Sequence, residues 1–311
     1  MRAMLLSTIL EAVLVLSAVP SARATGIYWT DPGSDSIGHA NLDGTGVNNK
    51  FISGVFYGPI GIAVDQTYLY YTFPTGLGAG SNNRIARANL DSTGVNNNFI
   101  GSDVFGFFPN SVAVDGSYIY WGDYNSQAIG RANLDGTGVN KNFITGVSPF
   151  DLTVDGAHIY WSTYQGNTIG RANLDGTGVN LSFITGASSP NGVAVDEAHV
   201  YWTNDFPNSL IGSIGRANLD GTGVNQSFVP SPSGWLMQPR GVAVDGTYLY
   251  WNDPSEGIIG RASLDGTDVI PNFSYYTTYY TWYIAVQPVP EPNTGLLVIA
   301  GLVGLAARHR S

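Results

Sequence analysis

The sequence predicts an all-β fold built from six copies of one unit. The phrase IGRANLDGTGVN occurs unchanged at 129–140, 169–180 and 214–225, with close variants at 37–48, 85–96 and 259–269. An aromatic pair heads each unit, and successive pairs lie 40 to 50 residues apart. Each unit contains four short strand-like runs joined by turns of the Asp-Gly type, which favour hairpins because glycine adopts a positive φ at little cost. This period is typical of propeller blades, so we predict a six-bladed β-propeller over residues 25–287.

The four runs of each unit are named strands A to D. GVAVD is strand A, YIYW is strand B, IGRANL is strand C and NFIT is strand D. The chain begins at strand B, and its last strand A is YIAV at 283–286. We therefore expect one blade to combine 283–286 with 27–53, which closes the ring and leaves no broad open edge. The other strands A are expected at 61–65, 112–115, 151–155, 192–196 and 241–245, which makes 24 strands in all.

Composition excludes several classes of function. The formal net charge is −10 and only 13 residues are Lys or Arg, so we expect no nucleic-acid partner. The absence of cysteine excludes disulfides, thiolate catalysis and cysteine metal sites. We expect no cofactor and no metal. Calcium at the NLDGTG turns is the alternative left open, although these turns lack the alternating carboxylates of a calcium loop.

Both ends of the chain have the character of targeting segments. Residues 1–24 carry Arg2, an apolar stretch and the small-residue site Ala22-Arg23-Ala24, so we predict a signal peptide cleaved after Ala24. Near the other end, residues 294–307 are uncharged and apolar, and Arg308-His309-Arg310 follow. A helix of that length rises about 21 Å against a hydrocarbon core of roughly 30 Å. We expect residues 288–311 to anchor the chain transiently in the inner membrane, with the basic end in the cytoplasm.

This tail resembles the PEP-CTERM sorting signal of Gram-negative bacteria. The resemblance rests on Val289, Pro290, Glu291 and Pro292, on the apolar segment, and on Arg308 and Arg310. It implies an exosortase-type processing enzyme as a partner, removal of the tail, and delivery to the cell surface or extracellular matrix. A plain single-span membrane anchor is the alternative.

The repeat resembles the YWTD repeat of the low-density lipoprotein receptor group. Tyr28-Trp29-Thr30-Asp31 matches the motif whole, 201–203 and 250–253 match it in part, and RANLDG matches the strand and turn that follow. The resemblance implies a six-bladed propeller. The motif's acidic residue is missing at 70–73 and 160–163, and no cysteine-rich modules flank the repeats, so receptor biology does not transfer.

Features that recur in every blade are interpreted as frame. In strand C the Gly-Ala side is thin, which lets a neighbouring blade approach closely. Arg131 recurs at one register, with His39 in the sixth blade, and we expect Arg131 and Asp135 to make blade-to-blade or turn-fixing contacts. His158 and His199 occupy a register that other blades fill with Tyr, so we interpret them as blade positions.

Features that differ between blades are interpreted as the functional part. The length changes fall in B–C connections (73–83, 204–213) and D–A connections (101–109, 229–239), which emerge on one face of an up-and-down blade. Aromatic candidates for ligand contact on that face are Phe107, Phe108, Phe150 and Trp235 on D–A loops, with Tyr124 and Tyr164 on B–C loops. The alternative is that several of these aromatic side chains only fill the space at the top of the propeller. Residues opening strand A are expected to surround the channel mouth and hold a small polar ligand or a metal ion: Asn110, Asp151, Asn191 and Arg240.

Two classes of function follow. The first is a non-catalytic, surface- or matrix-associated propeller that binds a polysaccharide or a protein through its variable loops. The second is a secreted enzyme of lyase or lactonase type with its site at the channel mouth, for which Asp123, Asp151 and Asp205 are the acidic candidates. A third reading is matrix packing material without a specific ligand. We favour the binding protein, because the variable loops offer no obvious general base and no cluster of His with carboxylates.

Overall fold

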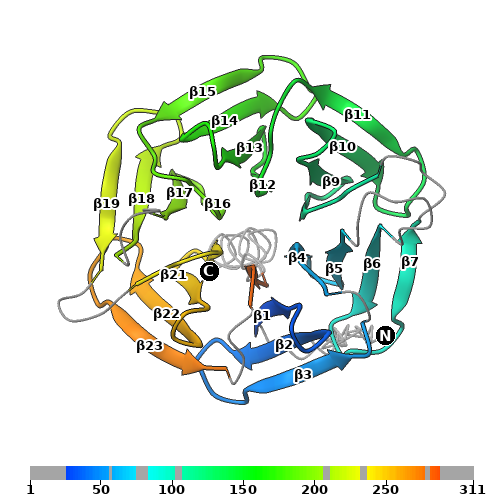
Figure 1. The fold of residues 1–311 in the computed structure, drawn as a ribbon, viewed down its shortest axis with the longest axis horizontal. Helices are drawn as coiled ribbons and strands as arrows, with labels where there is room; N and C mark the ends of the chain where they lie inside the picture. The colour runs from blue at the N-terminus through cyan, green and yellow to red at the C-terminus, as the bar shows by residue number, and fades with distance from the viewer. Residues whose placement is uncertain are drawn as a thin grey trace, which may run out of the picture.

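The computed structural model describes residues 26–55, 58–74, 83–101, 107–205, 211–231, 237–276 and 281–287. These residues form six four-stranded antiparallel sheets arranged radially around a channel, which confirms the predicted six-bladed propeller (Figure 1). The predicted signal peptide at 1–24, the predicted sorting segment at 288–311 and Trp235 lie outside the described residues. Within the described part, no helix has the length and apolar character to cross a membrane.

Each blade runs from its channel strand A to its outer strand D. Blade 1 comprises β24 (Ile284–Val286), β1 (Gly26–Asp31), β2 (Ser36–Asn41) and β3 (Asn48–Ser53). Blade 2 comprises β4 (Ile62–Val64), β5 (Tyr68–Phe73), β6 (Arg84–Asn89) and β7 (Asn96–Ile100). Blade 3 comprises β8 (Ser111–Val114), β9 (Tyr118–Asp123), β10 (Ala128–Asn133) and β11 (Asn140–Thr145).

The other three blades repeat this order. Blade 4 comprises β12 (Leu152–Val154), β13 (His158–Thr163), β14 (Thr168–Asn173) and β15 (Asn180–Thr185). Blade 5 comprises β16 (Val193–Val195), β17 (His199–Asn204), β18 (Ser213–Asn218) and β19 (Asn225–Pro230). Blade 6 comprises β20 (Val242–Val244), β21 (Tyr248–Asp253), β22 (Ile258–Ser263) and β23 (Ile270–Tyr275).

Blade 1 is assembled from both ends of the described chain, as the sequence predicts. Strand β24 pairs antiparallel with β1, with Trp29 opposite Ile284 and Ile27 opposite Val286. The N–H of Gln287 donates to the carbonyl of Gly26, which extends the pairing by one more bond. The six channel strands then form an unbroken cycle of neighbours, with β24 between β20 and β4.

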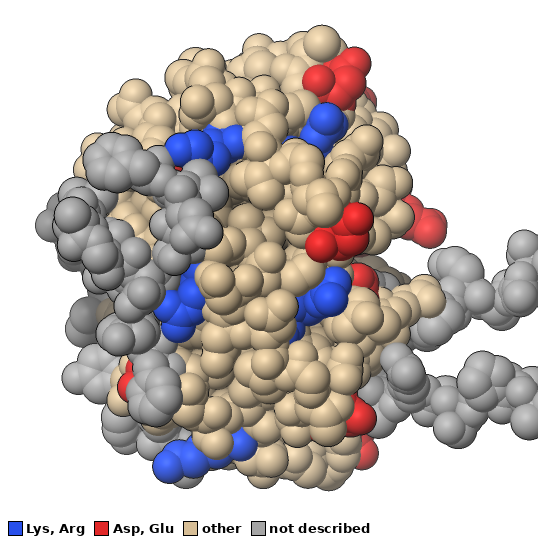
Figure 2. Space-filling view, turned by 90° about the vertical axis from the view of Figure 1, so that its right-hand side faces the viewer, with Lys and Arg blue, Asp and Glu red and all other residues tan. Residues whose placement is uncertain are grey.

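The strand directions give the disc two different faces. The B–C and D–A connections emerge on one side, called here the loop face, and the A–B and C–D turns emerge on the other, called the turn face. Gly26 opens a strand B and Gln287 follows a strand A, so both ends of the described ring lie on the turn face. The repeated aspartates of the A–B and C–D turns also lie there, and most of the acidic side chains visible in Figure 2 gather toward one side of the disc.

Tryptophan from strand B fills the space between neighbouring blades, and strand C is glycine where it lies. Trp121 is fully buried, and a Cβ added to its strand-C neighbour Gly130 would lie 2.1 Å from the indole Cε2. Trp121 also packs in a cluster with Ala63 and Tyr70 of blade 2. The thin side of strand C therefore makes room for the indole of its own blade, and that indole meets the neighbouring blade.

Five blades have this tryptophan–glycine pair, and in blade 2 both members of the pair are replaced. There the smaller Tyr71 lies opposite Ala86, so the missing ring volume is matched by an added methyl group. The other pairs in strand register are Trp29 with Gly38, Trp161 with Gly170, Trp202 with Gly215 and Trp251 with Gly260.

The repeated arginine joins each of blades 2 to 5 to the next blade. Arg131 lies between the rings of Tyr118 and Phe143, at 4.3 and 4.0 Å from their centroids, and its Nη1 donates to the carbonyl of Leu174 in blade 4. Asp135 does not pair with it. Its Oδ1 instead accepts from the N–H and the hydroxyl of Thr137 within the C–D turn. The arginine is thus the blade-to-blade contact and the aspartate the turn-fixing one.

The tryptophan–glycine pair generates a prediction about stability. Gly130→Ala lowers the free energy of unfolding by about 1–3 kcal/mol, because the new methyl group forces the indole out of its packed position. Combining it with Trp121→Tyr, which copies the Tyr71–Ala86 pair of blade 2, costs less than the sum of the two single changes by about 1 kcal/mol. Urea unfolding of the three variants measures the coupling, and strictly additive losses would contradict the packing account.

Candidate functional site

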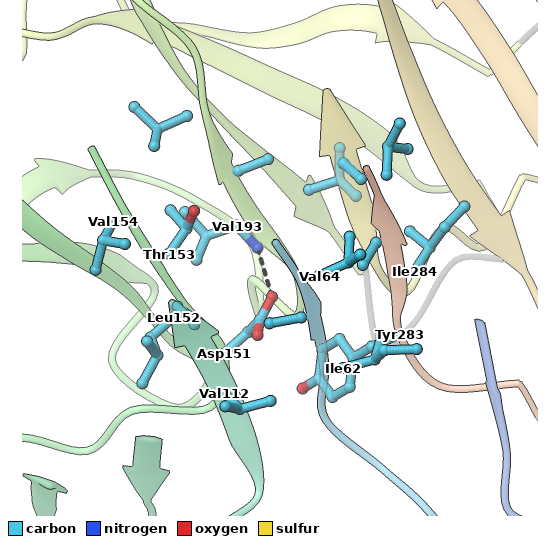
Figure 3. A pocket seen from close by; sticks show the side chains of 18 of the residues that line it. Ile62, Val64, Val112, Asp151, Leu152, Thr153, Val154, Val193, Tyr283 and Ile284 are labelled. Atoms are coloured by element: carbon cyan, nitrogen blue, oxygen red, sulfur yellow. Dashed lines mark hydrogen bonds between the residues drawn. The ribbon is translucent and has the colours of Figure 1, made fainter. Parts of the chain in front are cut away.

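The channel is a narrow cavity of about 150 Å³ bounded by all six strands A. Its wall is mostly Val, Ala and Ile, with Asp151 and Tyr283 as the large polar groups (Figure 3). Both stand directly before a strand A. Three other blades have glycine there (Gly61, Gly192 and Gly241), and blade 3 has Ser111 at the matching register, as the first residue of β8. The loop-face end of the channel is therefore the place where two blades depart from small residues.

Tyr283 reaches across the channel. Its strand β24 has β4 and β20 as neighbours in the ring, which places β12 of blade 4 on the opposite side. The Tyr283 hydroxyl nevertheless donates to the carbonyl of Phe150, directly before β12, at 3.2 Å. Burial holds the pKa of Tyr283 well above its ordinary value, and the carboxyl of Asp151 acts in the same direction, so the hydroxyl stays protonated and remains a donor. The side chain of Tyr283 thus spans the loop-face end of the channel.

Asp151 lies beside this phenol. As a residue it is half-buried, but its carboxyl group points into the channel, where Oδ2 accepts the N–H of Val193 at 3.0 Å (Figure 3). Burial raises the pKa of Asp151 to about 7, and hydrogen bonds from the N–H groups of Val193 and Leu152 oppose that rise. The group is therefore a carboxyl that exchanges its proton near neutral pH inside the channel.

The four residues expected around the mouth differ in their relation to the channel, although Asp151 and Arg240 both act electrostatically on Tyr283. Only Asp151 lines the channel cavity. Asn110, Asn191 and Arg240 stand one position earlier, at the register of Phe150, which is outside the channel wall. Asn191 is buried at 5% exposure, and the guanidinium of Arg240 lies 4.4 Å over the ring of Trp282.

Among the five aromatic candidates that the structure describes, three form a contact cluster and two do not join it. Phe107 is only 2% exposed and packs edge-on against Trp121 in the core, so its ring is not offered to a ligand. Phe108 is half-buried, and its N–H donates to Asp123.

Tyr124 and Tyr164 each contact Phe150, and the three residues are called here the aromatic shelf. The Phe150 ring stacks on Tyr164 with centroids 5.3 Å apart and planes at 30°, and it meets Tyr124 edge-on at 6.3 Å. All three rings are half-buried.

Asn110 holds two members of the shelf in place. In most blades the side chain of the fifth residue of strand B donates a hydrogen bond to the D–A loop of the next blade. In blade 5, for example, the Thr203 hydroxyl donates to the carbonyl of Arg240. Blade 3 has Gly122 at that position, which has no side chain to donate this hydrogen bond. Asn110 replaces it: its Nδ2 donates to the carbonyl of Phe150, and its Oδ1 accepts the N–H of Tyr124. Asn110 is therefore a positioning residue.

A surface hollow of about 440 Å³ lies next to the shelf, between blades 3 and 4. Tyr124 forms one edge of it. The remaining lining residues are Asn125, Gln127, Ser148, Thr163, Gln165 and Gly166. The lining carries hydrogen-bonding groups and no charged side chain.

Of the other two acidic candidates, Asp123 serves the fold through its carboxylate, and Asp205 forms hydrogen bonds through its backbone. Asp123 is buried, and its carboxylate accepts from the N–H and hydroxyl of Ser126 and from Phe108. The N–H of Asp205 donates to the carbonyl of Ser188. Over the described ranges, no group of three or more His, Asp or Glu side chains is placed to hold a metal ion. Asp151 is therefore the acid–base group that the described part of the channel offers.

Sequence reasoning missed Trp282 and Tyr283 as site residues. Aligning TWYIAV with PRGVAV shows the signal, since Trp282 then falls on Arg240 and Tyr283 falls on a glycine. It also missed the amides of the hollow, because Asn and Gln are common in turns and carry no distinguishing pattern.

Comparisons with known proteins show similarity at the level of fold. No family model and no curated protein matches the chain. A structure from a nidogen/laminin complex matches over 84% of this chain and 98% of its own, with a TM-score of 0.69 and 20% identity. A gluconolactonase from Xanthomonas campestris matches over 72% of this chain and 78% of its own, with a TM-score of 0.54 and 20% identity. A streptogramin B lyase matches over 84% and 83%, with a TM-score of 0.58 and 17% identity.

The raised pKa of Asp151 predicts a pH dependence of stability. Because the folded pKa of about 7 exceeds the unfolded value of 3.8, the folded state binds the proton more tightly. The stabilisation is complete below the unfolded pKa and is lost as the pH rises through about 7. Asp151→Asn keeps an oxygen to accept the N–H bonds but cannot ionise. We expect its melting temperature to match the wild type at pH 4 and to exceed it at pH 8. Parallel pH profiles for the two proteins would contradict the assignment.

Proposed function

We propose that this protein is an exported, surface- or matrix-associated propeller that binds a partner, a polysaccharide or a protein, through its loop face and without catalysis. One observation carries this proposal. The side chains that depart from the repeat meet on the loop face, where Phe150, Tyr124 and Tyr164 form a cluster of half-buried rings outside every blade core. Aromatic rings presented in this way are typical of recognition surfaces.

The position of the chain ends supports an orientation for this binding. Strand β24 ends on the turn face, so residues 288–311 continue from the side opposite to the aromatic shelf. If the C-terminal segment holds the chain in the inner membrane before an exosortase-type enzyme acts near Pro290-Glu291-Pro292, the turn face lies toward the membrane. The loop face then points away from it, free to meet a partner.

The comparisons are compatible with a protein partner in general. A propeller of this architecture occurs in a nidogen/laminin complex, so the fold is suited to forming a complex with another protein. Because the identity is only 20%, no residue role is carried over from that complex to this chain.

Catalysis at the channel mouth is the second candidate, and Asp151 is the observation that favours it. A carboxyl with a pKa near 7 is suited to general acid–base chemistry at neutral pH. A gluconolactonase and a streptogramin B lyase share the fold. Against this candidate, Tyr283 covers the carboxyl from across the channel and donates to Phe150. Turnover of a lactone or uronate substrate that Asp151→Asn abolishes would establish the enzyme.

The absence of cysteine allows a clean test of which face meets the partner. Gln165→Cys places one thiol on the loop face, and Val139→Cys places one on the turn face, both at exposed positions. We expect a membrane-impermeant maleimide to label both thiols on intact producing cells after matrix material has been washed away. With the matrix retained, labelling falls at the Gln165→Cys position and stays unchanged at the Val139→Cys position.

Two results would contradict the proposed function. Failure of both positions to label on intact cells would contradict exposure at the cell surface. Equal labelling at Gln165→Cys with and without the matrix would contradict a partner on the loop face.

A further inference from the structure

We propose that the aromatic shelf and the hollow beside it bind an uncharged polysaccharide chain. The proposal rests on the proposed function and names the ligand class of the same face. The shelf supplies ring faces for the apolar C–H faces of sugar rings, and the hollow supplies hydrogen-bonding groups for their hydroxyls.

The three rings stand where other blades have different residues. Tyr124 and Tyr164 open the four-residue B–C turns of blades 3 and 4, and the matching positions in blades 1 and 6 are Pro32 and Pro254. Phe150 stands at a register that other blades fill with Ile60, Asn110, Asn191, Arg240 and Trp282. The other four blades thus form without these three aromatic side chains, so folding of a blade does not require the cluster.

The backbone segments that carry Phe150 and Tyr124 are fixed by several hydrogen bonds. The carbonyl of Phe150 accepts from both Asn110 and Tyr283, and the N–H of Phe150 donates to Ser162. The carbonyl of Gln127, at the end of the turn that Tyr124 opens, accepts the N–H groups of Gly146 and Val147. A platform fixed before binding loses little conformational entropy when a ligand arrives.

The chemistry of the hollow selects an uncharged, hydroxyl-rich ligand. Asn125, Gln127 and Gln165 each offer amide donors and an acceptor, and Ser148 and Thr163 offer hydroxyls. The lining contains no Lys, Arg, Asp or Glu, so it provides no counter-charge for an acidic sugar. The net charge of −10 further disfavours a polyanion.

The size of the hollow fits a short stretch of a chain molecule. Its volume of about 440 Å³ falls in the usual range for small-ligand sites, and it is a surface hollow that the ends of a longer chain can leave freely. A protein partner normally buries about 800 Å² per side around an apolar centre. A small amide-lined hollow beside a ring platform matches one or two sugar units better than such an interface.

Affinity gel electrophoresis of the full chain in mild detergent tests the proposal. The gels contain laminarin, dextran, xylan or mannan as uncharged polysaccharides, or alginate as an acidic one. We expect at least one uncharged polysaccharide to retard the wild type and alginate to leave it unchanged. Phe150→Ala and Tyr164→Ala should each raise Kd about tenfold, the loss of one well-packed ring contact. Gln165→Ala, an exposed side chain that the fold does not use, should raise Kd severalfold while leaving the melting temperature unchanged.

Tyr275→Ala is the matched control, because Tyr275 is a tyrosine 60% exposed on the outer strand β23 and distant from the shelf. Its retardation should equal that of the wild type. The proposed ligand class is overturned if no uncharged polysaccharide retards the wild type, or if alginate alone does. The proposed site is overturned if retardation survives in Phe150→Ala, Tyr164→Ala and Gln165→Ala. If the thiol labelling shows protection of the loop face while no polysaccharide binds, the ligand class fails and the proposed function stands.

Discussion

Every blade of this protein can bury its two faces only against its two neighbours, so the ring has to close. The closure is made by three residues of β24, which add the fourth strand to blade 1. The largest fully buried side chains are all Trp or Tyr of strand B, and these rings lie between blades rather than at one shared centre. The protein lacks disulfides, so the packing of these rings and the arginine contacts between blades carry the stability.

This division between frame and face follows from the direction of the strands. The turn face is built from nearly identical Asp-containing turns whose carboxylates are satisfied within the turn, as Asp115 is by Ser117, Tyr118 and Tyr120. The loop face carries the connections that differ in length and composition. The repeated residues fix the end of every strand. Asp151 and Tyr283 therefore stand where other blades have glycine, and they change the channel mouth without changing the blade. Propellers that share this frame can therefore serve unrelated purposes.

Much of the fold was predictable because each of its determinants is local and repeated. The aromatic pairs, the Asp-Gly turns and the final YIAV gave six blades and the position of the seam before any contact was known. The packing details were not predictable in the same way. The glycine of strand C was expected to admit a neighbouring blade, whereas it admits the tryptophan of its own blade. That distinction depends on the direction of one side chain, which a repeat pattern does not contain.

The candidate site was predicted only in part, for a similar reason. Tyr124, Phe150 and Tyr164 were all expected on the loop face, and the structure brings them into contact. Phe107 was expected there too, but it turns inward onto Trp121. Asn110 was expected at the channel mouth; it does not line the channel, and its side chain supplies the hydrogen bond that Gly122 cannot make. Tyr283 was placed in the last strand A but not in the site, because a repeat pattern does not show that its side chain reaches across the channel to Phe150.

The central claim is that repeated residues build the frame and that departures from the repeat build the binding face. The most direct test restores the repeat at the shelf with Phe150→Asn and Tyr164→Pro, the residues that other blades carry at these positions. The measurements are the melting temperature and the fraction of protein retained with the extracellular matrix. We expect a melting temperature within about 4 °C of the wild type, which corresponds to a change of at most about 1–2 kcal/mol, and loss of matrix retention. A large fall in melting temperature, or full retention by the restored chain, would contradict it.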